Sequence, residues 1–407
     1  MANSRSTMRQ GETVDPKVAM QHAVLAVRRA WYSGVPDFAE WGSSDVESEP
    51  LVIHDLNGER LFYDFNVRLG KRTIGVVRAS ANTMVGSPVV SLQLGPHQWS
   101  NDDATREATA AVKRRDAHTD VNNTSLVCYC YPKIAVRVES TNREAGPSSI
   151  LIDVADLKPV ERFGSDGPEG ISSYSFLEEV AGSEADIRLR RWEAAEEERE
   201  ASIEAVSTAV EAKGAKIDLA LMSEKLFFPV KPHLDYIKLF SWKTLRYAPR
   251  CDVQEVFQLY AQKTDVYCAV ATGQMILDFY KYHFSQDEIA AAMGTGTSGT
   301  SNPGQVKGYE TLSNNGLNAT YDNTATWSEA KAEIDANRPL KSGIPRHARA
   351  CAGWKRQNFT LLGQQPKRWL KIYDPWPPSE NICKGGKIYW EDWDSIKHTN
   401  FIYVRHT

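Results

Sequence analysis

Residues 262–280 read QKTDVYCAVATGQMILDFY, and they place one cysteine, Cys268, where a polar stretch meets a run with helical spacing. Val270, Met275 and Phe279 lie close to one face of a helix that would begin at or just before Cys268. A thiol at a helix start lies among unpaired backbone N–H groups, where the thiolate is stabilised and the thiol pKa falls. The stretch therefore predicts either a small buried hydrophobe or a nucleophile.

Three further residues can give Cys268 the chemistry of a hydrolase. Gln262 can offer its side-chain amide beside the backbone N–H of Cys268, which is the usual composition of an oxyanion hole. His347 opens the strand-like run HARACAGW, so its ring can point out of the sheet edge as a general base. Asp374 ends the next strand-like run, RWLKIYD, where its carboxylate can fix the tautomer of His347. Cys351, on the strand of His347, is predicted to be a core residue.

This order of Gln, Cys, His and Asp is similar to that of the papain-like cysteine peptidases. The segments CAVATGQMILDFY, FSQDEIAAAMGT and HARACAGW resemble the bacterial peptidase C39-like branch, over about residues 240–407. The resemblance implies Cys268 as nucleophile, His347 as base and then acid, Asp374 as orienter and Gln262 as oxyanion donor. It implies an α+β catalytic domain in which the helix carrying the cysteine packs on an antiparallel sheet carrying the histidine and the aspartate. The cysteine is not in a C-G-S-C-W setting, and Asp replaces the Asn of papain.

The resemblance implies hydrolysis of a peptide or isopeptide bond in a peptide or protein substrate, through a thioester and without metal or organic cofactor. One alternative is an acyl transferase, in which an amine replaces water on the same thioester. Another is a catalytically silent binding protein. Arg346 favours that alternative, because a bulky cation before His347, where many relatives carry a small residue, could hinder the cleft or lower the pKa of His347 by repulsion; it could also recognise an acidic substrate group.

The sequence before the catalytic segment predicts a flexible tail over residues 1–14 and a separate α+β domain over residues 15–163. Asp15 and Pro16 form an N-cap and first position of a helix, and Asn57-Gly58 between two apolar runs predicts a β-hairpin. Further strand patterns and one short helix follow. We hypothesise that this domain is an inhibitory or chaperoning pro-domain, which would make the chain a zymogen; the alternative is a recognition module.

Residues 164–226 are predicted to be a linker, followed by the papain-like domain over residues 227–407. The linker begins with a Gly/Ser-rich connector, residues 164–173, and continues as a long helix from Ser183 to Gly214. Its middle, EAAEEERE, has almost no apolar stripe, so we expect solvent around it and packing only near its ends. We interpret the helix as a spacer; the alternative is an outer helix of the second domain.

Composition excludes several classes of protein. The net charge of -4 is spread without single-sign blocks, which argues against a nucleic-acid partner. No apolar window is long enough for a membrane span, and the amino terminus has no signal-peptide pattern. A cytoplasmic location is the default expectation, although an effector exported by another route would look the same. The six cysteines are too sparse for a disulfide scaffold and predict free thiols, with no metal site at Cys128 and Cys130. Oligomeric state is not encoded in these patterns.

Overall fold

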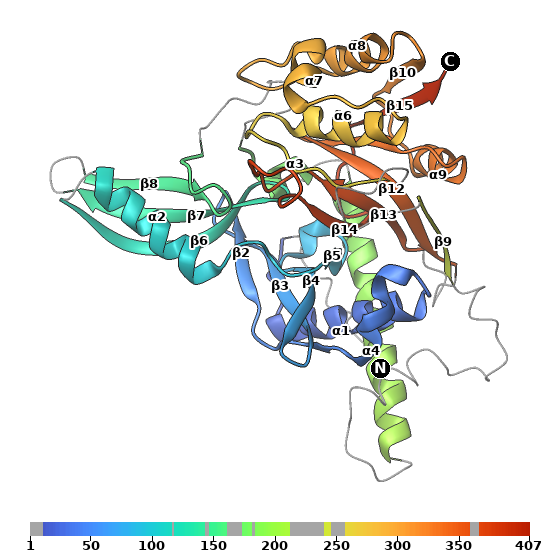
Figure 1. The fold of residues 1–407 in the computed structure, drawn as a ribbon. Coiled ribbons are helices and arrows are strands. Elements are labelled where there is room, and N and C mark those ends of the chain that lie inside the picture. The colour runs from blue at the N-terminus through green and yellow to red at the C-terminus, as the bar shows by residue number, and fades with distance from the viewer. Residues whose placement is uncertain are drawn as a thin grey trace.

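A computed structural model describes the chain over residues 11–115, 118–142, 146–160, 173–180, 184–211, 240–245, 257–358 and 366–407. The fold is mixed α+β, with one large sheet and helices on both of its faces (Figure 1). The helices are α1 (Pro16–Tyr32), α2 (Asn101–Arg115), α3 (Phe176–Val180), α4 (Ala185–Glu211), α6 (Cys268–Phe279), α7 (Gln286–Met293), α8 (Asn302–Leu312) and α9 (Trp327–Asp335), with 3-10 turns η1 (Pro36–Ser43) and η2 (Thr83–Val85).

The strands of the first half are β1 (Asp45–Val46), β2 (Leu51–Asp55), β3 (Arg60–Leu69), β4 (Arg72–Ser80), β5 (Val89–Leu94), β6 (Thr119–Cys130), β7 (Lys133–Asn142) and β8 (Gly146–Asp153). The strands of the second half are β9 (Phe240–Thr244), β10 (Leu317–Asp322), β11 (Leu340–Ile344), β12 (His347–Gln357), β13 (Arg368–Asp374), β14 (Lys387–Asp392) and β15 (Asn400–His406). Every pair is antiparallel among the described residues except β2 with β6.

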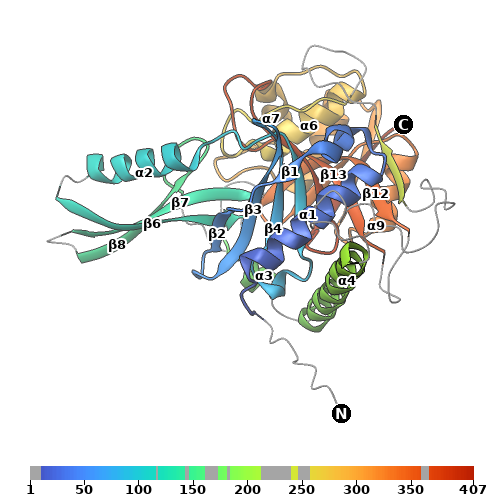
Figure 2. The same cartoon turned by 90° about the horizontal axis from the view of Figure 1, so that it is seen from below.

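Local sequence signals in the first half are confirmed. Asp15 caps α1, because its carboxylate accepts a hydrogen bond from the N–H of Lys17 at 2.7 Å, and Pro16 occupies the first turn. The hairpin of β2 and β3 turns at Asn57-Gly58, where Gly58 has a φ of 93° that a side chain would oppose. Figure 2 shows α2 lying along β6 and β7, which project with β8 from the rest of the molecule.

The two halves of the chain share one sheet. Its order is β10-β15-β11-β12-β13-β14-β5-β4-β3-β2-β6-β7-β8, with β1 and β9 pairing off this path. The joint is the antiparallel pair of β14 and β5, where Trp390 lies opposite Leu92. Trp390 also packs in one buried cluster with Phe38 and Trp41 of the first half. The predicted boundaries after residues 163 and 226 lie outside the described residues, as do residues 1–10 of the tail.

Helix α4 corrects one expectation. Its middle was predicted to be solvated, yet Glu196 and Glu198 are 8% and 2% exposed, while Ile187, expected to pack, is 41% exposed. The carboxylates are buried because each pairs with basic side chains from α1 or from the residue just before β13. Trp192, which was expected to pack, is 1% exposed. The helix is therefore a packed element in its described part, whereas the connector at 164–172, Ser183 and Gly214 lie outside the described residues.

Helix α6 lies between the sheet and two other helices. It packs on β12 and β11 on one side and against α7 and α8 on the other (Figure 1). Residues Cys268 to Leu277 are consequently all buried, whichever face of the helix they occupy. Strands β12 and β13 are antiparallel neighbours, so the strand that begins with His347 lies beside the strand that ends with Asp374.

The cysteines differ from the sequence expectation in one respect. Cys383 is disulfide-bonded, so the prediction that all thiols are free is wrong for this residue. Cys128, Cys130, Cys268 and Cys351 are free and buried. Within the described ranges, no cluster of three or more His, Cys, Asp or Glu side chains could hold a metal ion. None of the helices in those ranges is long and apolar enough to cross a membrane.

Candidate active site

Cys268 is the first residue of α6. The helix has no side-chain cap: the residue before it, Tyr267, only accepts the first backbone hydrogen bond, from Ala271 N at 2.8 Å. The N–H groups of a first turn have no partner inside the helix, so they are directed toward the region beside the thiol. Cys268 is fully buried and forms a small cluster with Ala269 and with Ala348, the second residue of β12. The helix start therefore packs beside His347.

His347 is positioned by a tight turn between β11 and β12. Ile344 pairs with His347 across the turn, which leaves Pro345 and Arg346 as its two central residues. Arg346 has a φ of 60°, as the second central residue of a type II turn requires, and glycine is the usual residue there. Any side chain at this position is strained, whatever its chemistry. The backbone conformation is therefore a reason for a small residue here, and the sequence analysis, which considered only the bulk and charge of Arg346, did not predict it.

His347 and Asp374 form a buried hydrogen-bonded pair. Nε2 of His347 lies 2.7 Å from Oδ1 of Asp374, which also accepts from the N–H of Trp376 at 2.9 Å. Burial lowers the pKa of His347 to about 4, despite the opposing effect of Asp374. Burial favours protonated Asp374, but the charge and hydrogen bond of His347 hold the pKa of this carboxyl below its usual range. Nδ1 of His347 is buried without a hydrogen-bond partner among the described residues, so it is the basic nitrogen of this tautomer.

A buried polar network supports the carboxylate from the opposite side. The hydroxyl of Tyr389 donates to Oδ2 of Asp374 at 3.1 Å and accepts from Nη1 of Arg349 at 3.0 Å. The same nitrogen of Arg349 donates to Oε2 of Glu391 at 2.6 Å. All of these side chains are essentially inaccessible. The sequence analysis missed this network, because alternation along β14 and β12 shows which residues share a face but not which partners they meet.

Gln262 is fully buried and anchored to the loop that follows Asp374. Its backbone N–H donates to the carbonyl of Pro375 at 3.0 Å, and its carbonyl accepts from Ser379 N at 3.0 Å. The side-chain Nε2 donates to the carbonyl of Thr264 at 2.6 Å, whereas Oε1 is buried without a hydrogen-bond partner in the described part of the chain. One N–H of the amide is therefore engaged locally, which leaves the second N–H available to another acceptor.

The turn between β6 and β7 covers this region from the first half of the chain. Sγ of Cys130 lies 3.9 Å from the carbonyl of Pro345, beside His347. Nζ of Lys133, which is 3% exposed, lies 4.4 Å from the ring centre of Trp376. Burial raises the pKa of the Cys130 thiol to about 11, so it stays protonated at neutral pH. No pattern in LVCYCYPK signalled this contact.

The assembled site is closed to solvent. Cys268, His347, Asp374 and Gln262 all have a relative exposure of 0%. The cations that help to lower the pKa of His347 are Lys133, from the covering turn, and Arg349 of the buried network. Cys351 is in the core as predicted, with Sγ 3.6 Å from the carbonyl of Gly353.

The fold and this site define a mixed α+β protein with a buried Cys, His and Asp in papain-like order. Residues 254–398 match the Peptidase_C39 like family. The match confirms the resemblance to the C39-like branch of the papain-like cysteine peptidases, over less than half of the chain. At the level of the family, it indicates a cysteine peptidase and hence a hydrolase. No curated protein matches the sequence.

Solved structures also resemble part of the chain. The peptidase domain of Streptococcus ComA, a bifunctional ABC transporter involved in a quorum-sensing pathway, is 16% identical with a TM-score of 0.28, over 37% of this chain and 99% of that one. A double glycine motif protease from an AMS/PCAT transporter, in complex with the leader peptide, is 17% identical with a TM-score of 0.26, over 40% and 99%. UfSP from C. elegans is 15% identical with a TM-score of 0.28, over 40% and 33%.

Proposed function

We propose that the protein is a papain-like cysteine peptidase with Cys268 as its nucleophile. The thiol passes its proton to Nδ1 of His347, and the sulfur attacks the carbonyl carbon of a peptide or isopeptide bond. The side chain of Gln262 and the N–H of Cys268 hold the resulting oxyanion. His347 then gives its proton to the departing amine, which leaves a thioester. Water, deprotonated by His347, hydrolyses the thioester and restores the thiol.

One observation carries this proposal: the 2.7 Å contact of His347 Nε2 with Asp374, combined with an unpartnered, buried Nδ1. Asp374 fixes the tautomer of His347, which leaves Nδ1 as the basic nitrogen. The start of α6, with Cys268, packs beside this histidine. A neutral resting imidazole, supported by the pKa of about 4, is ready to accept the proton of the thiol.

The test is labelling of Cys268 with an epoxysuccinyl probe, together with profiling against a peptide library. We expect modification and cleavage that depend on Cys268 and are lost in His347→Ala. Cys351→Ala is the matched control, because it removes another buried free thiol, four residues beyond His347 on β12. A folded protein whose Cys268 stays inert in every form, including the opened form described below, would instead be a silent binding protein.

We further propose that the described chain is a zymogen-like, closed form, in which residues 15–163 act as an inhibitory domain. The support is the turn of β6 and β7, whose Cys130 and Lys133 contact the loops beside His347 and Asp374. A substrate cannot approach Cys268 while that residue is fully buried. Removal of the whole domain is a poor test, because β5 and β14 share the sheet and Trp390 would lose its neighbours.

Two smaller perturbations test the inhibition. A specific protease site placed within residues 164–172 allows the chain to be cut while both halves stay present. Lys133→Ala loosens the covering turn without cutting, and Lys158→Ala, an exposed lysine of the same half, is its control. We expect Cys268 to be labelled at least about tenfold faster after cutting or in Lys133→Ala, a difference of about 1.4 kcal/mol in barrier. Equal rates in all forms would contradict inhibition.

Transfer to an amine remains the alternative outcome of the same chemistry, since the triad does not select the acceptor. Adding a primary amine to the opened enzyme separates the two reactions. A peptidase releases the free acid, whereas a transferase accumulates the amide product.

A further inference from the structure

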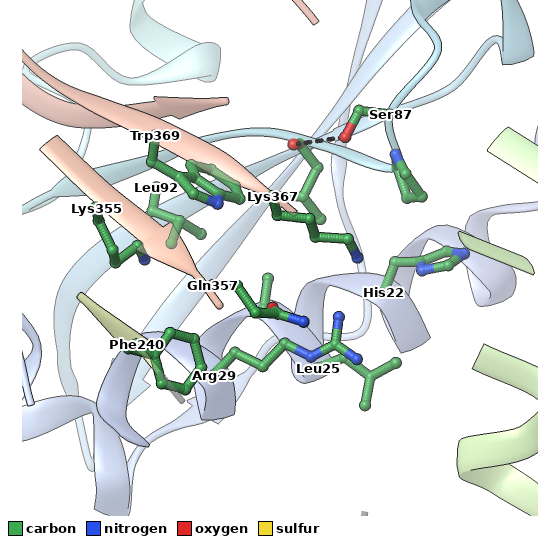
Figure 3. A pocket seen from close by; sticks show the side chains of 13 residues that line it. His22, Leu25, Arg29, Ser87, Leu92, Phe240, Lys355, Gln357, Lys367 and Trp369 are labelled. Atoms are coloured by element: carbon green, nitrogen blue, oxygen red, sulfur yellow. Dashed lines mark hydrogen bonds between the residues drawn. The ribbon is translucent and has the colours of Figure 1, made fainter. Parts of the chain in front are cut away.

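A pocket lies between α1, β9 and the strands β5, β12 and β13. Figure 3 shows Arg29, Gln357 and Lys367 reaching into it from α1, β12 and the residue before β13. Leu25, Leu92 and Trp369 are among its apolar walls. The cavity is ≈ 40 Å³, room for a carboxylate in place of a few water molecules, and it opens to solvent.

The pocket is separate from the candidate active site. Lys355, which lines it, lies eight residues beyond His347 on β12. At about 3.3 Å per residue, the two residues are roughly 26 Å apart along the strand. None of the residues that line the pocket belongs to the triad or its supporting network.

Basic side chains outnumber carboxylates at this pocket. Arg29 and Lys367 share a single carboxylate, Glu198 of α4, at 2.5 Å and 2.9 Å. His22 is hydrogen-bonded to Glu196, which also pairs with Arg199. Neither Glu196 nor Glu198 is among the residues that line the pocket, and each is already engaged by two basic groups.

Lys355 is a buried cation without a hydrogen-bonded counter-ion. It is 4% exposed, and its Nζ lies 4.8 Å, 5.0 Å and 5.6 Å from the ring centres of Phe38, Trp369 and Trp390. No acceptor is within hydrogen-bond distance of this ammonium in the described part of the chain. Burial lowers the pKa of Lys355 to about 7, against the longer-range pull of Asp37 and Asp392. A buried ammonium in this state is stabilised by an added anion.

We propose that this pocket binds a small carboxylate with an apolar body. The carboxylate meets the basic groups of Lys355, Lys367 and Arg29, and the apolar body lies against Leu25, Leu92 and Trp369. The combination of basic groups with apolar walls suits such an amphipathic acid. Two sources share this chemistry: a free small-molecule acid, and the C-terminus of a peptide that ends in an apolar residue.

The test uses the full chain and N-acetyl-leucine as the probe, by isothermal titration calorimetry. N-acetyl-leucinamide is the matched ligand, because it differs only by the charge of the carboxylate. We expect the acid to bind with a Kd of about 1 mM or tighter and the amide to bind at least about tenfold more weakly. Lys355→Met keeps the volume within the aromatic rings and removes the cation, so it is expected to weaken the acid about tenfold.

Lys371→Met is the control variant. Lys371 is also a buried cation beside Trp390, but it pairs with Asp37 and does not line the pocket. This variant is expected to bind the acid as the wild type does. A tetrapeptide with a free C-terminal leucine distinguishes the sources: binding identifies peptide termini, and exclusion of the peptide while the small acid binds identifies a free acid. Equal binding of acid and amide, undiminished binding by Lys355→Met, or no binding of either acid overturns the proposal.

Discussion

Tyr389→Phe tests whether the buried network sets the state of the His347 and Asp374 pair. The change removes only the hydroxyl that donates to Oδ2 of Asp374 and accepts from Arg349. Arg349 keeps Glu391 as an acceptor, so Asp374 is the group that loses its partner. A hydrogen bond to a charged, buried group contributes about 1.5–3 kcal/mol, and we expect the free energy of unfolding at neutral pH to fall by about that amount.

The same variant has an effect that a merely structural role would not produce. With one donor fewer, the carboxylate of Asp374 is a stronger acceptor, so the pKa of His347 is expected to rise. Urea unfolding measures the stability, and an NMR titration of the imidazole signals measures the pKa. Tyr403→Phe is the matched control, because it removes a Tyr–Asp hydrogen bond of 3.0 Å to Asp322 at the far edge of the sheet. Unchanged stability and an unchanged His347 titration would refute the role assigned to Tyr389.

Three further predictions concern the turn and helix α4. Arg346→Gly is expected to be about 1 kcal/mol more stable than Arg346→Ala in urea, because only glycine adopts the positive φ without strain; an Ala variant of equal stability would argue against that strain. Arg29 and Lys367 outweigh the effect of burial and lower the pKa of Glu198 from 4.5 to about 2. The ionised Glu198 therefore contributes its full stabilisation at pH values above 4.5 and loses it as the pH falls toward 2. Glu198→Gln should therefore cost about 3 kcal/mol at pH 7, and its urea midpoint should converge with that of the wild type as the pH falls from 4.5 toward 2. Trp192→Ala should cost about 3–5 kcal/mol, and a loss near zero would show that α4 does not belong to the core.

The closed site and the pocket of Lys355 suggest separate ways to control one protein. Opening the β6–β7 turn would rehydrate His347 and remove Lys133 from its surroundings, and both changes raise the pKa of the imidazole. A ligand in the pocket of Lys355 would instead act on the joint between the halves, since Trp390 of β14 and Phe38 of η1 both touch that ammonium.

Much of the candidate site was predictable from sequence because its signals are local. A polar stretch before a helical run located the start of α6 at Cys268, and turn residues located His347 at the beginning of a strand and Asp374 at the end of another. Consecutive strands usually pair, so two of these side chains were expected to meet, and they lie 2.7 Å apart. The catalytic role of each remains the proposal that the labelling experiment tests.

The sequence alone determined the elements whose causes are local: the cap at Asp15, the turn at Gly58, and the helix that begins at Cys268. Only the tertiary structure decided that β5 pairs with β14, that Glu198 is buried, and that the β6–β7 turn covers the site. The physical reason is that periodicity and capping report the contacts of neighbouring residues. Pairing of distant strands and neutralisation of a buried charge depend on partners a hundred or more residues away, which leave no regular spacing to read.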